Sequence, residues 1–168
     1  MEKTRLPEPW LRGTLADVAP VQRAVLHALE LAWEDLERWC GKLSDDQLNL
    51  RPSGIAPVAF HIRHIARSMD RLLTYAEGNP LTVDQIAEMK RELDAGATRD
   101  ALFAELQQAF AAAGRRIRAF SEKEFSQPRA IGRQQLPTTL GGLLVHVADH
   151  TQRHAGQAIT TAKIVSSK

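Results

Sequence analysis

The sequence predicts an all-α protein: a four-helix bundle with one extra short helix between the second and third long helices. Three observations lead to this fold class. Four long stretches repeat apolar residues at alternating spacings of three and four, which is typical of helices that bury one face. Glycine, proline and helix-capping residues fall between these stretches. Apolar and polar residues nowhere alternate convincingly, so strand signals are nearly absent.

The length of 168 residues suits one domain with a substantial core and leaves little room for two. We therefore expect a single domain over residues 1–168. Within it, residues 1–18 form an irregular lead-in, because two prolines and a glycine interrupt them. Trp10 and Leu11 are the apolar residues expected to pack this lead-in onto the body of the protein.

The first long helix begins at Pro20 and ends at Gly41, since proline suits a first helical turn and glycine terminates helices. Its expected inward residues are Val21, Val25, Leu29, Ala32, Leu36 and Trp39. A capping-box pattern at residues 44–47 predicts a short helical turn. The second long helix spans residues 57–77 and stops at a Gly-Asn-Pro sequence.

Residues 82–94 predict the extra short helix, which is amphipathic and has Thr82 as its cap. Thr98 can cap the third long helix, over residues 99–121. Residues 124–137 contain two prolines and a glycine and predict a loop.

The fourth long helix spans residues 138–163 and carries three of the six histidines, His146, His150 and His154. Side chains four residues apart stack along one flank of a helix, although each step turns by about 40°. The apolar spacing assigns the inward face to Leu140, Leu144, Val147, Thr151, Ala155, Ala158, Ala162 and Val165. His154 therefore lies beside the centre of this face and His150 near it, whereas His146 lies nearer the rim.

Two imidazoles one helical turn apart can share a metal ion, as the histidines of H-E-x-x-H do. Such a pair can equally belong to a solvated helix flank, so the metal hypothesis needs a third ligand from elsewhere in the chain. The second helix offers two histidines. Its apolar stripe favours His61, which flanks the stripe, over His64, which lies further round.

Composition excludes several classes of protein. The net charge of +2 and the dispersed basic residues give no drive toward nucleic acid, and no apolar run approaches a membrane span. Arg63, Arg67 and Arg71 share one helical flank, which we expect to be solvated, with an acidic-ligand rim as the alternative. The single cysteine excludes an internal disulfide, and the N-terminus lacks the apolar region of a signal peptide, so we expect a cytoplasmic protein.

Two segments carry a resemblance to a known family. The first is HIARSMDR at residues 64–71 on the second helix, and the other is HVADHTQRHAGQ at residues 146–157 on the fourth. Together they resemble the DinB-like superfamily of four-helix-bundle metalloproteins, which includes thiol-dependent transferases that use mycothiol or bacillithiol. The resemblance covers most of the chain: helix order, a long second connection and a closing H-x-G-Q all fit.

The resemblance implies a metal triad at His64, His150 and His154, with His61 as the substitute for His64. His146 also matches a position that is often histidine in the family, and its rim placement suggests a supporting or pocket-lining role. Gln157 lies close in angle to His150 and is either a pocket residue or a polar flank residue. Three neutral imidazoles leave a divalent ion with open coordination positions, and Zn²⁺ and Ni²⁺ both suit nitrogen ligands.

Two classes of function follow. The first is a metal-dependent enzyme that acts on a small molecule, either a transferase of a low-molecular-weight thiol or a hydrolase. The second is a non-catalytic bundle, which binds metal or partners in a stress response, or keeps its histidines as polar core. The sequence names no catalytic side chain and shows no nucleophile–base pair or phosphate-binding glycine loop, so the enzyme hypothesis depends on the metal. Relatives are often homodimers, which implies a homodimer here as well.

Overall fold

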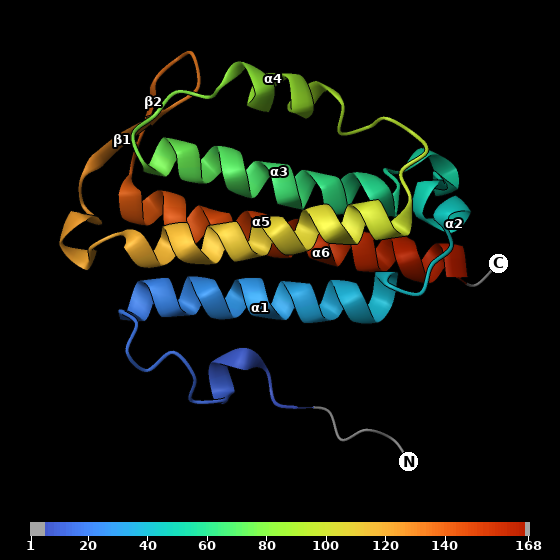
Figure 1. Ribbon diagram of the computed structural model, residues 1–168, viewed down its shortest axis with the longest axis horizontal. Coiled ribbons are helices and arrows are strands. Elements are labelled where there is room, and N and C mark those ends of the chain that lie inside the picture. Colours follow the sequence, from blue (N-terminus) through green and yellow to red (C-terminus); the bar gives the residue numbers. More distant parts are fainter. Residues whose placement is uncertain (1–5, 167–168) are drawn as a thin grey trace.

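The computed structural model describes residues 6–166, in which four long helices lie side by side and form a bundle (Figure 1). These four helices are α1 (Pro20–Cys40), α3 (Val58–Ala76), α5 (Arg99–Ala119) and α6 (Leu140–Ser166). The extra short helix between the second and third long helices is α4 (Val83–Lys90). The four-helix bundle is thereby confirmed, with each long helix within three residues of its predicted bounds at either end.

Helix α6 lies at the centre of the packing, because its most extensive contacts are with α3 and α1, and α5 packs chiefly on α3. The eight residues assigned to its inward face are all buried, as predicted: Leu140, Leu144, Val147, Thr151, Ala155, Ala158, Ala162 and Val165. The seven apolar members join one hydrophobic core with the buried residues of the other three long helices. The stripe that turns α6 into the bundle also fixes the direction in which its histidines point.

The lead-in is attached differently from what the sequence predicts. Trp10 and Leu11 are 62% and 57% exposed, so the expectation that they pack onto the body is wrong. The short 3₁₀ turn η1 (Pro9–Leu11) buries its proline instead, and Arg12 pairs with Glu30 and Glu34 of α1 at 3.1 and 2.6 Å. The spacing of apolar residues cannot predict these ion pairs, because they join segments that are far apart in the sequence. Residues 1–5 of the predicted lead-in lie outside the described residues.

Both ends of α1 also depart from the prediction, because Val21 and Trp39 are exposed although the apolar spacing places them inward. Each stands in a terminal turn, where less of the neighbouring helices remains to cover a side chain. The Trp39 ring instead makes a cation–π contact with Lys163, whose ammonium group lies 4.3 Å from the ring centroid. Cys40, at the end of the same helix, is fully buried, and burial raises the pKa of its thiol to about 12.

The connections hold shorter elements. Helix α2 (Asp45–Asn49) has the predicted capping box, in which Ser44 and Gln47 exchange side-chain and backbone hydrogen bonds. A 3₁₀ turn, η2 (Pro52–Gly54), follows it, and another, η3 (Glu122–Glu124), follows α5. No helix within residues 6–166 is long and apolar enough to cross a membrane.

The predicted loop before the last helix contains a β-hairpin, formed by β1 (Pro128–Ile131) and β2 (Leu136–Thr139) in antiparallel register. The prediction of a loop is wrong here, because four-residue strands that each contain a proline are too short to show alternation. Since the hairpin extends to Thr139, α6 begins at Leu140 instead of residue 138. The Thr139 hydroxyl accepts the backbone N–H of Gly142 at 3.1 Å and so caps the helix that carries three histidines.

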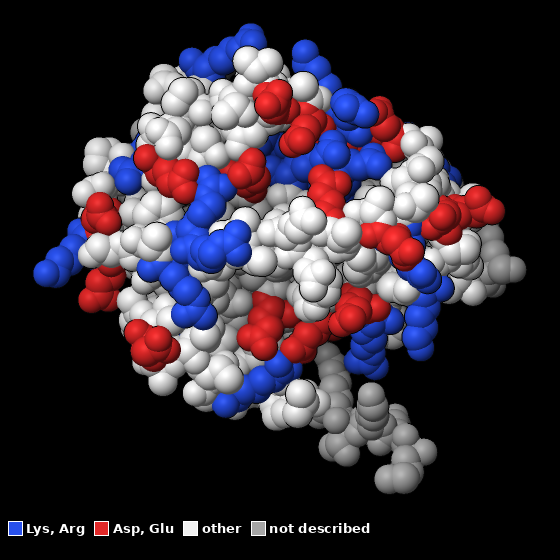
Figure 2. Space-filling model, in the orientation of Figure 1, with Lys and Arg blue, Asp and Glu red and all other residues white. Residues whose placement is uncertain are grey.

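The arginine flank of α3 is not the solvated surface that the sequence predicts. All three arginines face the connection between α3 and α5, and the guanidinium groups hold that connection against the bundle. Arg63 donates to the carbonyls of Arg91, Glu92 and Asp94, Arg67 to the carbonyl of Glu88 and the carboxylate of Glu105, and Arg71 to the carboxylate of Glu92. Elsewhere on this face, basic and acidic side chains are interspersed (Figure 2).

Replacing Gln22 by alanine is expected to lower the free energy of unfolding by about 1–3 kcal/mol. The buried amide of Gln22 on α1 donates to the carbonyls of Ile117 and Phe120 at the end of α5, at 2.6 and 2.8 Å. The substitution leaves these carbonyls without their donor. Urea unfolding of both proteins measures the difference, and equal midpoints would contradict this account of how α1 and α5 are joined.

Candidate metal centre

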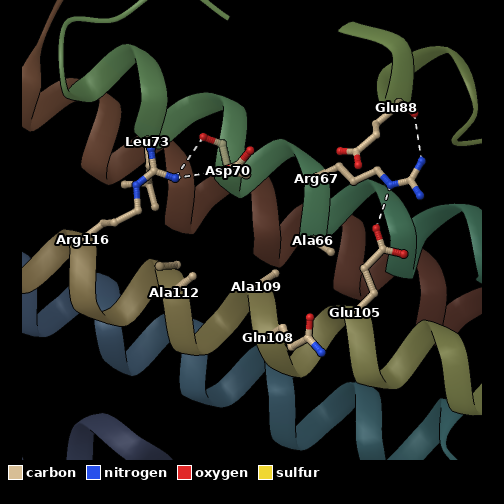
Figure 3. A pocket seen from close by; sticks show the side chains of 11 residues that line it. Ala66, Arg67, Asp70, Leu73, Glu88, Glu105, Gln108, Ala109, Ala112 and Arg116 are labelled. Carbon is tan, nitrogen blue, oxygen red and sulfur yellow. Dashed lines mark hydrogen bonds and ion pairs between the residues drawn. The ribbon is translucent and has the colours of Figure 1, made fainter. Parts of the chain in front are cut away.

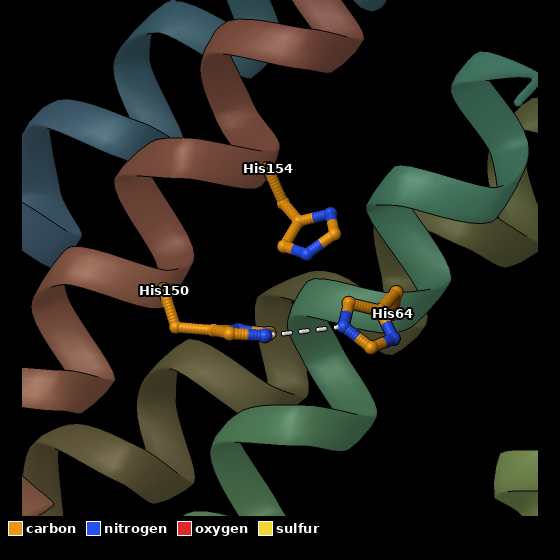
Figure 4. Close-up of side chains that lie close together, drawn as sticks. All are labelled: His64, His150 and His154. Atoms are coloured by element: carbon orange, nitrogen blue, oxygen red, sulfur yellow. Dashed lines mark hydrogen bonds between the residues drawn. The ribbon is translucent and has the colours of Figure 1, made fainter. Parts of the chain in front are cut away.

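Three histidines meet between two long helices. His64 comes from α3, and His150 and His154 come from successive turns of α6. One ring nitrogen from each lies within 4.8 Å of the other two, and Figure 4 shows the three rings turned toward one another. These are the three residues to which the resemblance assigns the metal.

The spacing suits a small divalent ion. Nε2 of His64 and Nε2 of His150 are 3.3 Å apart. Two nitrogens that each lie about 2.0–2.1 Å from one zinc ion, at a tetrahedral angle, are about 3.3 Å from each other. His64 and His150 are therefore already at the separation that a shared ion requires.

In each of the three rings, Nδ1 lies within hydrogen-bonding distance of another side chain of the protein. Nδ1 of His64 lies 2.7 Å from the carboxylate of Glu92, and Nδ1 of His150 lies 3.3 Å from the hydroxyl of Ser68. Nδ1 of His154 lies 3.1 Å from Nδ1 of His61. Such partners fix the orientation of metal-binding histidines in proteins, and they leave Nε2 of every ring for the space between the helices.

The partners favour one position for the proton on two of the rings. Glu92 is an acceptor when ionised, so Nδ1 of His64 donates to it. The hydroxyl of Ser68 donates to the carbonyl of Ile65, and its oxygen is then placed to accept from Nδ1 of His150. In the neutral form, an imidazole with its N–H on Nδ1 carries a lone pair on Nε2. Two lone pairs facing each other at 3.3 Å repel, and a cation between them removes the repulsion.

The electrostatics of the site keep three of its histidines neutral near pH 7. Burial first, and neighbouring imidazoles second, lower the pKa of His61, His150 and His154 to about 4. Burial opposes the ionisation of Glu92, but hydrogen bonds from His64 and Arg71 outweigh it and hold the pKa of this carboxyl below its ordinary value. Near pH 7, His150 and His154 therefore offer neutral nitrogen ligands that have no proton to lose before they bind an ion.

The structure separates the two histidines of α3 that the sequence left as alternatives. His61 is buried behind His154, whereas His64 faces both histidines of α6. The position of the apolar stripe favours His61 as the ligand, because the stripe indicates which side chains are buried and not which of them face α6. His64 is less buried than His61, with 18% of its side chain exposed, yet its Nε2 is the nitrogen of α3 that lies 3.3 Å from His150.

The remaining predicted positions lie at the edge of the cluster or outside it. His146 is at the rim: its side chain is 43% exposed, its ring centroid is 5.5 Å from that of His150, and its Nδ1 is 3.7 Å from the carboxylate of Asp149. Gln157 is exposed on α6, which agrees with the alternative that it is a polar residue on the flank of the helix.

Sequence reasoning assigned no role to three residues that contact the cluster. Glu92 and Ser68 bond to two of the rings, and Phe60 stacks on His64 with ring centroids 5.3 Å apart. The position of Ser68, four residues after His64 on the same helix, could have pointed to it. No spacing rule connects Glu92 to His64, because they are 28 positions apart in the sequence.

Comparisons with known proteins agree with this architecture. A family model described as the DinB superfamily matches residues 28–158. A conserved protein from Enterococcus faecalis is 19% identical with a TM-score of 0.74, over 90% of this chain and 100% of that one. YfiT from Bacillus subtilis, described as a probable metal-dependent hydrolase with an unusual four-helix bundle topology, is 17% identical with a TM-score of 0.65, over 86% and 87%. No curated protein matches the chain.

Proposed function

Because the chain belongs to the DinB superfamily, we propose that its three-histidine cluster holds a divalent metal ion and that the protein is a metal-dependent enzyme acting on a small molecule. The observation that carries the proposal is the cluster of three ring nitrogens between α3 and α6, in which Nε2 of His64 and Nε2 of His150 lie 3.3 Å apart. The description of YfiT as a probable metal-dependent hydrolase supports it.

The chain's own residues would divide the work as follows. His64, His150 and His154 would bind the ion through Nε2, while Glu92, Ser68 and His61 hold the rings in place. Phe60 covers one face of His64 and limits the access of water to that ring. Zn²⁺ or Ni²⁺ bound by three imidazoles keeps open positions and supplies a Lewis acid that lowers the pKa of a water or a thiol.

Two reactions use the same ligand set. Hydrolysis of a small electrophile follows the description of YfiT, and transfer of a low-molecular-weight thiol follows the superfamily resemblance. Both require a small-molecule substrate that reaches the half-buried rings. The cytoplasmic location and the homodimer stay predictions.

The test is elemental analysis of protein purified without an affinity tag or a chelator, beside a His150→Ala/His154→Ala variant. We expect about one Zn or Ni per chain, lost in the double variant. A His146→Ala variant is the matched control, because His146 lies on the same helix at the rim and should leave the metal content unchanged. The metal-loaded protein is then assayed for ester and amide hydrolysis and for thiol consumption with electrophiles.

Absence of metal from the wild-type protein, together with failure to bind added Zn²⁺ and Ni²⁺, would overturn the proposal. Metal without turnover in any assay would support the non-catalytic metal-binding bundle instead. In that case the cluster would be a site for an ion but not for a reaction.

A further inference from the structure

We infer that Glu92 is the positioning residue of the metal centre: its carboxylate, held by Arg71, fixes His64 in the orientation that binds the ion. The inference rests on the proposed function, since it concerns the affinity of the same cluster for metal. According to this inference, a residue outside the four long helices contributes to the affinity of the cluster for metal.

The carboxylate of Glu92 bonds in two directions at once. Oε2 accepts from Nδ1 of His64 and Oε1 accepts from Nη1 of Arg71, each at 2.7 Å. The side chains of Glu92 and Arg71 are only 6% and 10% exposed. Water therefore competes little for either bond, and rotation of the carboxylate would break both.

Glu92 differs in kind from the other two groups that hold the rings. Ser68 and His61 are neutral and lie 3.3 and 3.1 Å from their histidines, whereas Glu92 carries a charge and lies 2.7 Å from His64. Hydrogen bonds to an ionised acceptor are shorter and about twice as strong as neutral ones. Among these three ring supports, Glu92 should have the largest effect on metal affinity.

His64 depends on this support more than the other ligands do. His150 and His154 stand on one helix at a fixed spacing, so the backbone of α6 holds them relative to each other. His64 reaches the ion alone from α3, and Phe60 restrains only the plane of its ring. The bond to Glu92 determines which nitrogen carries the proton and therefore which nitrogen faces the ion.

The segment that carries Glu92 is itself fastened to α3. Nη1 of Arg63 donates to the carbonyls of Arg91, Glu92 and Asp94, at 3.3, 3.1 and 2.9 Å. The backbone around Glu92 is thus tied to the helix that supplies His64, by the residue that directly precedes His64. The arginine flank accordingly serves the metal centre by placing the carboxylate.

The experiment compares Glu92→Gln with the wild-type protein in competition for Zn²⁺ against a chromophoric chelator. Glutamine keeps the size of the side chain and removes its charge. We expect the affinity for Zn²⁺ to fall about 10- to 100-fold. The matched control is Glu105→Gln, which removes the carboxylate partner of a neighbouring arginine, Arg67, without touching a histidine (Figure 3), and should leave the affinity unchanged.

A second measurement reads the orientation of His64 without metal. Long-range ¹H–¹⁵N spectra of the metal-free protein should show the His64 proton on Nδ1 in the wild type and in Glu105→Gln, and a changed or mixed tautomer in Glu92→Gln. Thermal unfolding of each metal-free variant verifies that it is folded. If Glu92→Gln does not fold, Arg71→Met replaces it: it leaves the carboxylate and removes the group that fixes it, so a smaller loss of affinity is expected.

Wild-type affinity in a folded Glu92→Gln protein, or in Arg71→Met where the first does not fold, would overturn the inference. An unchanged His64 tautomer would overturn it as well. If the wild-type protein binds no Zn²⁺, the proposed function fails, and the tautomer spectra still decide whether Glu92 orients His64. The two failures are therefore distinguishable.

Discussion

Replacing His64 by alanine is expected to lower the affinity for Zn²⁺ on the order of a thousandfold, while replacing His61 costs much less. Three ligands share a binding free energy on the order of 12 kcal/mol, so one ligand accounts for roughly a third of it. Within the cluster, the hydrogen-bond partner of His61 is Nδ1 of His154, so His61 supports a ligand without facing the ion. Loss of an outer partner typically weakens binding about 10- to 100-fold, and for a neutral partner such as His61 we expect the lower end of this range.

Chelator competition with His64→Ala and His61→Ala measures both effects. The comparison also decides between the two ligand assignments that the sequence left open. A larger loss in His61→Ala than in His64→Ala would make His61 the ligand and contradict the geometry of the cluster. Circular dichroism of both variants is the control, because His61 is buried and its removal leaves a cavity.

Acidification of the metal-free protein from pH 7 to pH 5 is expected to lower its free energy of unfolding by about 3 kcal/mol, roughly 1 kcal/mol from each of three histidines once the partial exposure of the rings is allowed for. Burial first, and neighbouring imidazoles second, lower the pKa of His61, His150 and His154 to about 4, from an ordinary 6.5. Below pH 6.5 the unfolded chain therefore binds more protons than the folded one. Stability is complete above that pH and is lost progressively down to pH 4.

Urea unfolding at several pH values measures this dependence. His61→Gln removes one of the three titrating groups, so its loss of stability between pH 7 and pH 5 should be about one third smaller. His146→Ala, at the exposed rim, is the control and should change the dependence less than His61→Gln does. Constant stability from pH 7 to pH 5 would show that the rings are more accessible to water than their burial indicates.

The long helices could be predicted from the sequence because each buries one face along its whole length. The spacing of Leu140, Leu144 and Val147 fixes the direction of α6, and the buried residues follow it. The same spacing fails where a terminal turn extends beyond its neighbours, as at Val21 and Trp39. The spacing of apolar residues also cannot predict the hairpin, whose four-residue strands are too short to show a recognisable repeat.

The site could be predicted only in part, for a related reason. His150 and His154 are one turn apart on one helix, so their proximity is encoded locally. Only the family motif places His64 beside them, since the helical wheel alone favours His61. Glu92 and Arg71 meet across a long connection, and nothing in their own neighbourhoods marks the contact. Contacts between distant segments are where a single sequence stops being informative.

The burial of Cys40 has a practical consequence for testing thiol chemistry. Its sulfur is inaccessible within the folded chain and its pKa is raised to about 12, so almost none of it is thiolate at neutral pH. It is also the single cysteine of the sequence. The native protein should therefore contribute no background to a colorimetric thiol titration, and any thiol that disappears with an electrophile comes from the added reagent alone.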